Sequence, residues 1–303
     1  MHFRLYPLRL SFLARGAISF SRGTAGNQLR GAFGSILHKL ACVPDCGDAH
    51  NCERRESCEY ALMFAPAAAN GPSGLADRPR PFVFRANHLD GRTVAPGEAF
   101  HFNFHWFDLR RPSVKLAIRA FAELATEGLG PERSAAELVD VTGGDTPLMV
   151  SLDPAGARVD RVTLRFETPT ELKADGHSVA EPEFAILAAR IRDRISTLRA
   201  LYDEGPLKLD FREFTERAAQ IRMTRCDIRH LDVSRRSSQT GQVHPLGGFV
   251  GEAEYEGDLT EFIPYLHAAA WTGVGRQTAW GKGVLRVTKE SEIAPRIKAV
   301  GVH

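Results

Sequence analysis

The sequence lacks any long hydrophobic run. No stretch of about 18 uninterrupted apolar residues occurs in its 303 residues, so no membrane-spanning helix is predicted. The first 16 residues carry three arginines and have no apolar core of the length that a signal peptide needs. We therefore expect a cytoplasmic protein without a membrane partner.

Lysine is also scarce. Seven of the 39 basic residues are lysines, and arginine supplies the other 32. Either the base composition of the genome or recognition of planar and phosphate groups by guanidinium produces such an excess. The net charge of +2 hides an uneven distribution, because residues 240–269 hold no Lys or Arg while the flanking segments 212–236 and 270–303 are basic. If the two basic segments meet in the fold, they form a stripe for a polyanion; otherwise they are ordinary solvated faces.

Several catalytic motifs are absent. The sequence contains neither the G-x-S-x-G of serine hydrolases nor the G-x-x-x-x-G-K-[ST] phosphate loop. In their place, residues 271–283 read WTGVGRQTAWGKG, and a strand rather than a helix is predicted after them, which excludes a dinucleotide-binding fingerprint. Glycines free backbone N–H groups to line an anion, and Arg276 and Lys282 supply charge. This glycine-rich loop, 273–283, is therefore interpreted as a phosphate-backbone site, with a plain tight turn as the alternative.

The order of predicted elements divides the chain into two similar halves. Each half interleaves strands with two helices, which is typical of the split βαβ, ferredoxin-like fold. We therefore predict an α+β protein of two tandem ferredoxin-like domains, residues 1–152 and 153–303. The strand predicted over 99–109 places aromatic residues on one face and His101 and His105 on the other. We expect this second face to be exposed to solvent, with a metal site at the two histidines as the alternative.

Four of the five cysteines lie within 17 residues, in a Cys-rich insert at 42–60 that follows the first predicted helix. Their pattern is C-x3-C-x5-C-x5-C, formed by Cys42, Cys46, Cys52 and Cys58. Four thiols so close in a cytoplasmic protein favour a metal site over disulfides. Zinc, an iron–sulfur cluster and free or reversibly paired thiols are the alternatives, and four cysteine ligands would make the site structural because no coordination position stays open.

The helix predicted over 26–42 separates two faces. Its leucines and Phe33 recur at helical spacing, whereas Asn27, Gly31, Gly34 and His38 lie on the opposite face. Each glycine costs about 1 kcal/mol relative to alanine inside a helix, so close approach by another backbone, of protein or ligand, is a reason to keep them. His38 on this face is the strongest candidate for acid–base chemistry, with Arg30 and Lys39 nearby.

These motifs together resemble the CRISPR-associated precursor-crRNA-processing endoribonucleases of the RAMP superfamily. The resemblance rests on the R-x-S turn at 235–237, GGFVGE, the helix after Gly257-Asp258-Leu259, the G-x-G-[KR]-x-T-x-x-G-x-G loop, and LRGAFGSILHKLAC followed by the four cysteines. The segments AELATEGLG and TPTELK, the latter followed by an arginine-rich helix, also match. The resemblance therefore covers nearly the whole chain.

The resemblance implies two RRM-like domains that bind one CRISPR repeat RNA and cleave it without metal. The ribose 2′-OH attacks the neighbouring phosphate and leaves 2′,3′-cyclic phosphate and 5′-OH ends. His38 matches the position of the family's frequent general base, and Lys39, Lys282 or Arg276 would stabilise the developing charge. The residues expected to contact RNA are Arg30, Arg222, Arg225, Arg229, Arg235, Arg236, Gly273, Gly275, Arg276, Gly281, Lys282 and Gly283.

Two other functions remain open from the sequence. The first is a non-catalytic crRNA-binding subunit that works with other CRISPR effector subunits, in which His38 would be incidental. The second is a zinc-stabilised scaffold without an RNA role.

Overall fold

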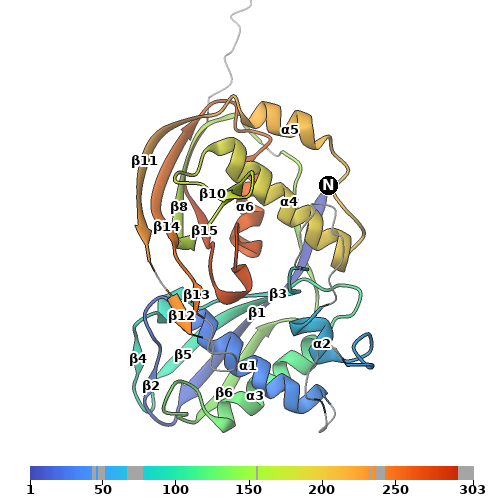
Figure 1. Ribbon diagram of the computed structural model, residues 1–303, viewed down its shortest axis with the longest axis vertical. Helices are drawn as coiled ribbons and strands as arrows, with labels where there is room; N and C mark the ends of the chain where they lie inside the picture. The colour runs from blue at the N-terminus through green and yellow to red at the C-terminus, as the bar shows by residue number, and fades with distance from the viewer. Residues whose placement is uncertain are drawn as a thin grey trace, which may run out of the picture.

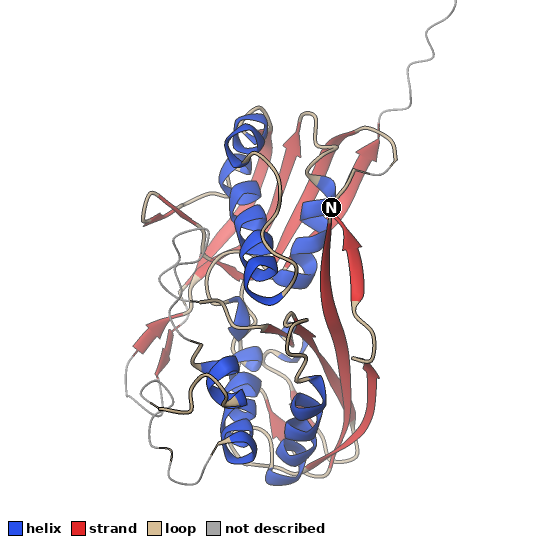
Figure 2. Ribbon diagram, turned by 90° about the vertical axis from the view of Figure 1, so that its right-hand side faces the viewer, coloured by secondary structure: helices blue, strands red, loops and turns tan. Residues whose placement is uncertain are grey.

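A computed structural model of the chain contains two antiparallel sheets, one above the other in Figure 1. It describes residues 1–42, 46, 52–66, 78–154, 156–232, 234–236 and 243–292, without the side chains of 234–236, 243–245 and 292. Within these residues no helix is long and apolar enough to cross a membrane. In Figure 2 the helices of both halves lie against their own sheets.

The N-terminal half has the order βαββαβ with strand order β3-β5-β1-β6, which is the ferredoxin-like arrangement. A fifth strand, β7, pairs with the first residues of β1. The main elements are β1 (His2–Ala14), α1 (Ala25–Ala41), β3 (Phe82–Arg85), β5 (Ala99–Trp106), α3 (Val114–Glu127), β6 (Ala136–Gly143) and β7 (Leu148–Ser151). The smaller elements are β2 (Ile18–Ser19), paired with β4 (Thr93–Val94), α2 (Glu59–Phe64) and the 3-10 turn η1 (Asn87–Leu89).

The C-terminal half repeats this arrangement, with strand order β11-β14-β8-β15. Its main elements are β8 (Val159–Thr170), α4 (Phe184–Tyr202), α5 (Phe211–Ala218), β11 (Arg222–Leu231), β14 (Gly248–Glu256), α6 (Ile263–Thr272) and β15 (Leu285–Glu292). The hairpins β9 (Lys173–Ala174) with β10 (His177–Ser178) and β12 (Ser234–Arg236) with β13 (Val243–Pro245), and the 3-10 turn η2 (Thr278–Trp280), complete it. The predicted tandem ferredoxin-like fold, with the cysteines after the first helix, is confirmed.

The core of the N-terminal half is built from aromatic rings. Phe100, Phe102, Phe104 and Trp106 alternate along β5 and are all buried, as the sequence pattern predicts. Phe33 of α1 stacks on Phe121 of α3 at 4.5 Å between ring centroids, which fastens both helices over the sheet.

The two halves pack against each other through buried side chains. Phe3, Leu5 and Phe107 belong by sequence to the first half but pack in the hydrophobic cluster of the second. His105, expected to face solvent, is buried, with its Nδ1 2.9 Å from the carbonyl of Trp271 in α6. That expectation is wrong because the other half covers this face of β5. The division at residues 152 and 153 stays a prediction.

Candidate functional site

The glycine-rich loop joins α6 to β15 and contains η2. All four of its glycines have a positive φ, between 66° at Gly283 and 83° at Gly281. A Cβ on Gly275 would lie 2.3 Å from the carbonyl oxygen of Glu171, and one on Gly283 would lie 1.9 Å from that of Val274. Only glycine fits these positions, so the glycines shape a tight loop against the end of β8.

The N–H groups of the loop are used inside the protein. Three glycine amides donate to carbonyls: Gly273 to Ala269 at 2.7 Å, Gly281 to Thr278 at 3.1 Å and Gly283 to Pro169 at 3.2 Å. The expectation that the glycines free their amides for an anion is therefore wrong for these three, because each amide already has a partner. Positive charge near the loop comes from side chains.

Lys282 lies buried where the loop meets the first turn of α1. It is 3% exposed, and its Nζ has no hydrogen-bond partner among the described residues. Burial lowers the pKa of Lys282 to about 8, although the charge of Asp90 acts in the opposite direction. Asp90 accepts a hydrogen bond from the N–H of Ala25 at 2.8 Å, which holds it at the start of α1. A buried ammonium without a partner is unfavourable, so an incoming anion would find a strong partner here.

Two arginines converge on the last carbonyls of α6, directly before the loop. Arg85 of β3 donates to the carbonyls of Ala270 and Trp271 at 3.1–3.3 Å, and Arg194 of α4 donates to that of Thr272 at 2.9 Å. Burial lowers the pKa of Arg85 to about 9, and the charge of Arg194 adds to the effect. The cations complement the helix C-terminus, yet neither has an ion pair with a described carboxylate. Sequence reasoning missed Arg85, whose one signal was a charge ending the apolar strand FVFR.

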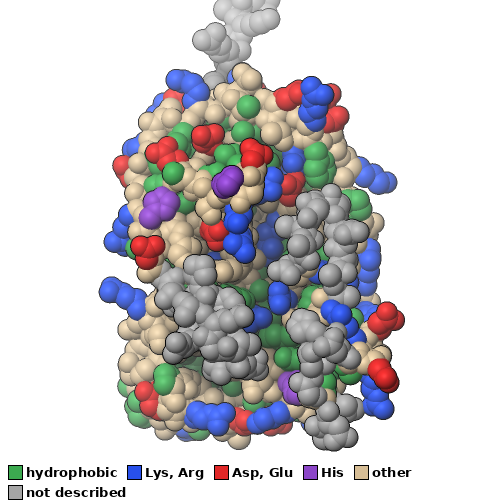
Figure 3. Space-filling view, viewed as in Figure 1, with side chains coloured by type: hydrophobic (Ala, Val, Ile, Leu, Met, Phe, Trp, Pro, Cys, Tyr) green, Lys and Arg blue, Asp and Glu red, His purple; other side chains and the backbone are tan. Residues whose placement is uncertain are grey.

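Further cations border the loop. Arg30 of α1 places its guanidinium over the rings of Phe64 and Trp280, 5.2 and 5.3 Å from their centroids. A cleft of about 210 Å³ between the loop and α4 is lined by Lys173, Arg190, Arg194, Arg276, Glu171 and Asp193. Figure 3 shows Lys and Arg side chains gathered in the middle of this face, between the two halves. The loop region is therefore electropositive.

The arginines predicted on β11 lie in a different environment. Arg222 is 3.4 Å from Glu256, and Arg225 is 2.7 Å from Asp227 and 3.5 Å from Glu252. Arg229 is exposed and has no ion pair with a described residue. Arg235 and Arg236 lie in β12, but their side chains fall outside the described part of the chain.

The acidic segment of the sequence separates the two basic ones in space. β14, with Glu252, Glu254 and Glu256, lies between β11 and β8, while β15 forms the other edge of the sheet. The glutamates also pair with β8, since Arg165 is 2.6 Å from Glu252 and Arg161 is 3.0 Å from Glu256. The prediction that 212–236 and 270–303 meet in a continuous basic stripe is therefore wrong for this sheet.

The glycine-bearing face of α1 packs on protein. A Cβ on Gly34 would lie 2.7 Å from the Phe64 ring, and one on Gly26 would lie 3.0 Å from the carbonyl of Trp280, whereas Gly31 has open space. His38 contacts the ring of Tyr60 edge to face at 4.7 Å. Lys39 points elsewhere and pairs with Glu127 of α3 at 2.6 Å, so the structure does not bring it together with His38.

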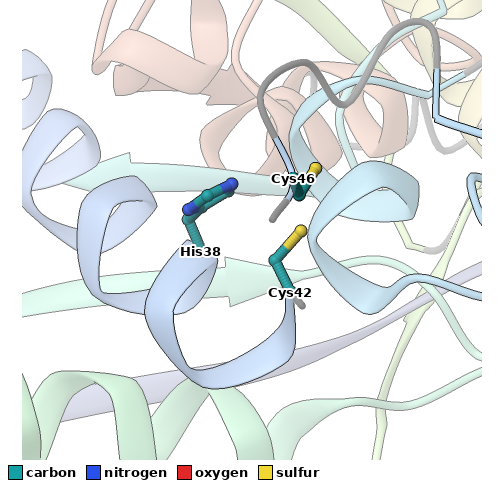
Figure 4. A group of neighbouring side chains, drawn as sticks. All are labelled: His38, Cys42 and Cys46. Atoms are coloured by element: carbon teal, nitrogen blue, oxygen red, sulfur yellow. The ribbon is translucent and has the colours of Figure 1, made fainter. Parts of the chain in front are cut away.

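His38 also belongs to a cluster of possible metal ligands. Donor atoms of His38, Cys42 and Cys46 all lie within 4.8 Å of one another (Figure 4). Cys58 lies at the same end of α1, with its Sγ 3.8 Å from the carbonyl of Ala41. Burial, helped by the neighbouring Cys46 and Cys58, raises the pKa of the Cys42 thiol to about 12. The described residues thus assemble a histidine with cysteines that can hold a metal ion, and Cys52 is not in the group of three.

Two family models match the chain, one in each half. Residues 164–285 match the family CRISPR_Cas6, "CRISPR-associated endoribonuclease Cas6", and residues 3–153 match AF_1859_N, described as an N-terminal domain. No curated protein matches the chain.

Several solved structures share the fold. A Cas6 product complex from Thermus thermophilus is 20% identical, with a TM-score of 0.58 over 93% of this chain and 99% of the other. A second Cas6 product complex is 18% identical, with a TM-score of 0.54 over 95% and 100% of the two chains. A partial Cas6-RT-Cas1--Cas2 complex is 11% identical, with a TM-score of 0.58 over 95% of this chain and 46% of the other.

The structural matches support the tandem fold, and the family match covers most of the C-terminal half, from β8 to the first residue of β15. The resemblance seen in the sequence is thereby confirmed for the second half: residues 164–285 are similar to the CRISPR-associated endoribonuclease Cas6 family.

Proposed function

We propose that the chain binds CRISPR repeat RNA across the glycine-rich loop and cleaves precursor crRNA at one site, without a metal ion in the cleavage step. One observation carries this proposal. Arg85, Arg194 and Lys282 place positive charge beneath the loop, and none of the three has an ion pair with a described carboxylate. Such charge favours a polyanion that brings its own negative groups into a partly desolvated site.

The proposed chemistry begins with the ribose 2′-OH. His38 takes the proton of this hydroxyl, the 2′ oxygen forms a bond to the adjacent phosphorus, and the bond from phosphorus to the 5′ oxygen breaks. The leaving 5′ oxygen takes a proton from water, and protonated His38 returns its proton to the solvent, so the ends are a 2′,3′-cyclic phosphate and a 5′-OH. Lys282 lies at the first turn of α1, about 15 Å or more along the axis from His38, so it would hold the RNA backbone beside the scissile nucleotide rather than the phosphorane itself. Arg276, which pairs with Glu171 at 3.4 Å, would do the same.

The position of His38 is compatible with a strand that runs along α1. Arg30, Gly34 and His38 follow one another at intervals of four residues, so they share one stripe of the helix. His38 lies about 12 Å further along the axis than Arg30, at 1.5 Å per residue. The Phe64 ring covers Gly34 between them, so an RNA strand held at Arg30 and Trp280 would pass over α2 to reach His38 after a few nucleotides.

The repeat RNA and other CRISPR proteins are the proposed partners. One matched structure holds Cas6 with RT, Cas1 and Cas2, and this assembly is a starting point for a search for protein partners. Zinc has a structural place in the proposal: held by thiolates of the Cys-rich insert, it would fasten the end of α1 to α2.

The test is a cleavage assay with a labelled cognate repeat in excess EDTA. We expect one cut, and we expect a substrate with 2′-H at the scissile nucleotide to bind as tightly and not be cut. Cutting of the deoxy substrate would contradict the mechanism. Binding of the unmodified repeat without any cut would instead favour the non-catalytic crRNA-binding subunit.

A further inference from the structure

The cluster at the end of α1 joins the proposed general base to the cysteines. His38 and Cys42 are four residues apart on one helix face, which brings their side chains together. Cys46 adds a second sulfur within 4.8 Å of both. Cys58, directly before α2, lies at the same helix end, so it is the nearest further thiol.

The distances suit a tetrahedral ion. Zinc binds sulfur at about 2.3 Å and imidazole nitrogen at about 2.0–2.1 Å, so its ligand atoms are roughly 3.5–3.8 Å apart. Donor atoms that already lie within 4.8 Å need to close by about 1 Å only, which side-chain rotations can supply. A tetrahedral set of thiolate and imidazole ligands suits zinc.

We propose that a thiophilic divalent cation, typified by Zn²⁺, binds to His38, Cys42 and Cys46, with Cys58 beside them, and that the occupied protein binds RNA without cleaving it efficiently. The inhibitory part rests on the proposed function, in which His38 is the base. A coordinated imidazole donates to the metal the lone pair that would accept the 2′-OH proton, so one His38 cannot serve both roles. Arg30 lies about 12 Å from His38 along α1, and Lys282 lies further away at the first turn of this helix, so both keep their charge and RNA binding persists.

The ligand set is tested on the full chain with Co²⁺, whose visible spectrum reports sulfur and nitrogen ligands. The chain is first stripped of metal with a chelator under reducing conditions. We expect one equivalent of Co²⁺ to bind, Cys42→Ser and Cys46→Ser each to weaken the sulfur charge-transfer band, and His38→Gln to shift the d–d bands. Cys52→Ser and Cys226→Ser are matched controls and should leave the spectrum unchanged. An unchanged spectrum in His38→Gln, together with loss in Cys52→Ser, would establish a four-cysteine site and overturn the proposal.

The inhibition is tested as a ratio of cleavage rates in EDTA and in one equivalent of Zn²⁺, measured for each variant separately. We expect a ratio of about 100 for the natural chain, since a general base contributes roughly 10²–10⁴-fold, and a ratio near one for Cys46→Ser. RNA affinity should differ less than about two-fold between the two conditions. A zinc-loaded natural chain that cuts at its EDTA rate would overturn the proposal.

The two proposals fail in different ways. A chain that never cuts in EDTA overturns the proposed function and the inhibitory consequence with it. The Co²⁺ spectrum of His38→Gln still decides the ligand set in that case.

Discussion

The chain presents positive charge in two contrasting ways. On the outer face of the second sheet, Arg222 and Arg225 are exposed and lie against glutamates of β14. Beneath the glycine-rich loop, Arg85 and Lys282 are buried, and their neighbours are mostly carbonyls and apolar groups. Exposed pairs in water contribute about 0–1 kcal/mol and are largely neutralised, whereas a desolvated cation interacts strongly with any anion that reaches it. Environment, rather than the number of arginines, therefore decides where a polyanion binds.

Removing the buried ammonium of Lys282 should have the largest effect on RNA binding. We expect Lys282→Met to weaken binding of repeat RNA by about 30-fold or more, because loss of a desolvated charge contact costs about 2–5 kcal/mol. The melting temperature should stay the same or rise, since methionine fills the space without a buried charge. Fluorescence anisotropy at fixed salt and a thermal melt measure both quantities.

Lys289→Met is the matched control, because Lys289 of β15 is exposed. It should change RNA affinity less than about three-fold. Equal effects of the two substitutions would remove the distinction between buried and exposed cations.

A smaller effect is expected from pH. Because the pKa of Lys282 is lowered to about 8, its ammonium is charged at pH 7 and mostly neutral at pH 9, so RNA affinity should fall by about ten-fold between them. Folding stability should change with pH in the opposite direction. The unfolded chain keeps this proton up to about pH 10.5, whereas the folded chain loses it near pH 8, so the contribution of Lys282 to folding stability rises between these two values. Dissociation constants at pH 7, 8 and 9 and constant ionic strength check the first claim. A pH profile of Lys282→Met as steep as that of the natural chain would refute it.

The smallest effects concern the exposed sheet face. Arg225→Ala should alter RNA affinity by less than about two-fold, because this side chain already pairs with Asp227 and Glu252. Arg229→Ala is the substitution to compare with it, because Arg229 is exposed on the same strand and has no ion pair with a described residue. If RNA crosses this face, Arg229→Ala should lower the salt slope of binding by about one. An equal or larger effect of Arg225→Ala would mean that RNA displaces the glutamates.

Sequence patterns predicted the fold well where periodicity alone is sufficient. The alternation of Phe100, Phe102, Phe104 and Trp106 predicted the buried face of β5, and burial of all four confirms it. The same alternation placed His105 on the opposite face but did not show what covers that face. Its burial against Trp271, 166 residues away in sequence, depends on contact between the halves.

The candidate site was predictable in part. Glycine spacing and two cations pointed to the loop, and positive φ at all four glycines explains why these positions need glycine. Arg85 and Asp90 escaped prediction because neither lies in a motif, and both act on elements distant in sequence, α6 and α1. The role of the loop amides was also mispredicted: Gly273 and Gly281 bond to carbonyls of the preceding turn, and Gly283 bonds to Pro169 of β8, a partner that exists only after the loop folds onto that strand.

Local patterns alone determined the two ferredoxin-like halves, the aromatic core and the special backbone of the loop, because hydrophobic periodicity and glycine conformation act over a few residues. Tertiary structure decided which charges are free. It placed the glutamates of β14 beside the arginines of β11, and it buried Arg85 and Lys282 where no carboxylate of the described residues pairs with them. It also brought Cys46 to the pair His38 and Cys42, which helical spacing alone places together. Electrostatic interactions depend on distance and desolvation in space, and neither quantity is written in the order of the residues.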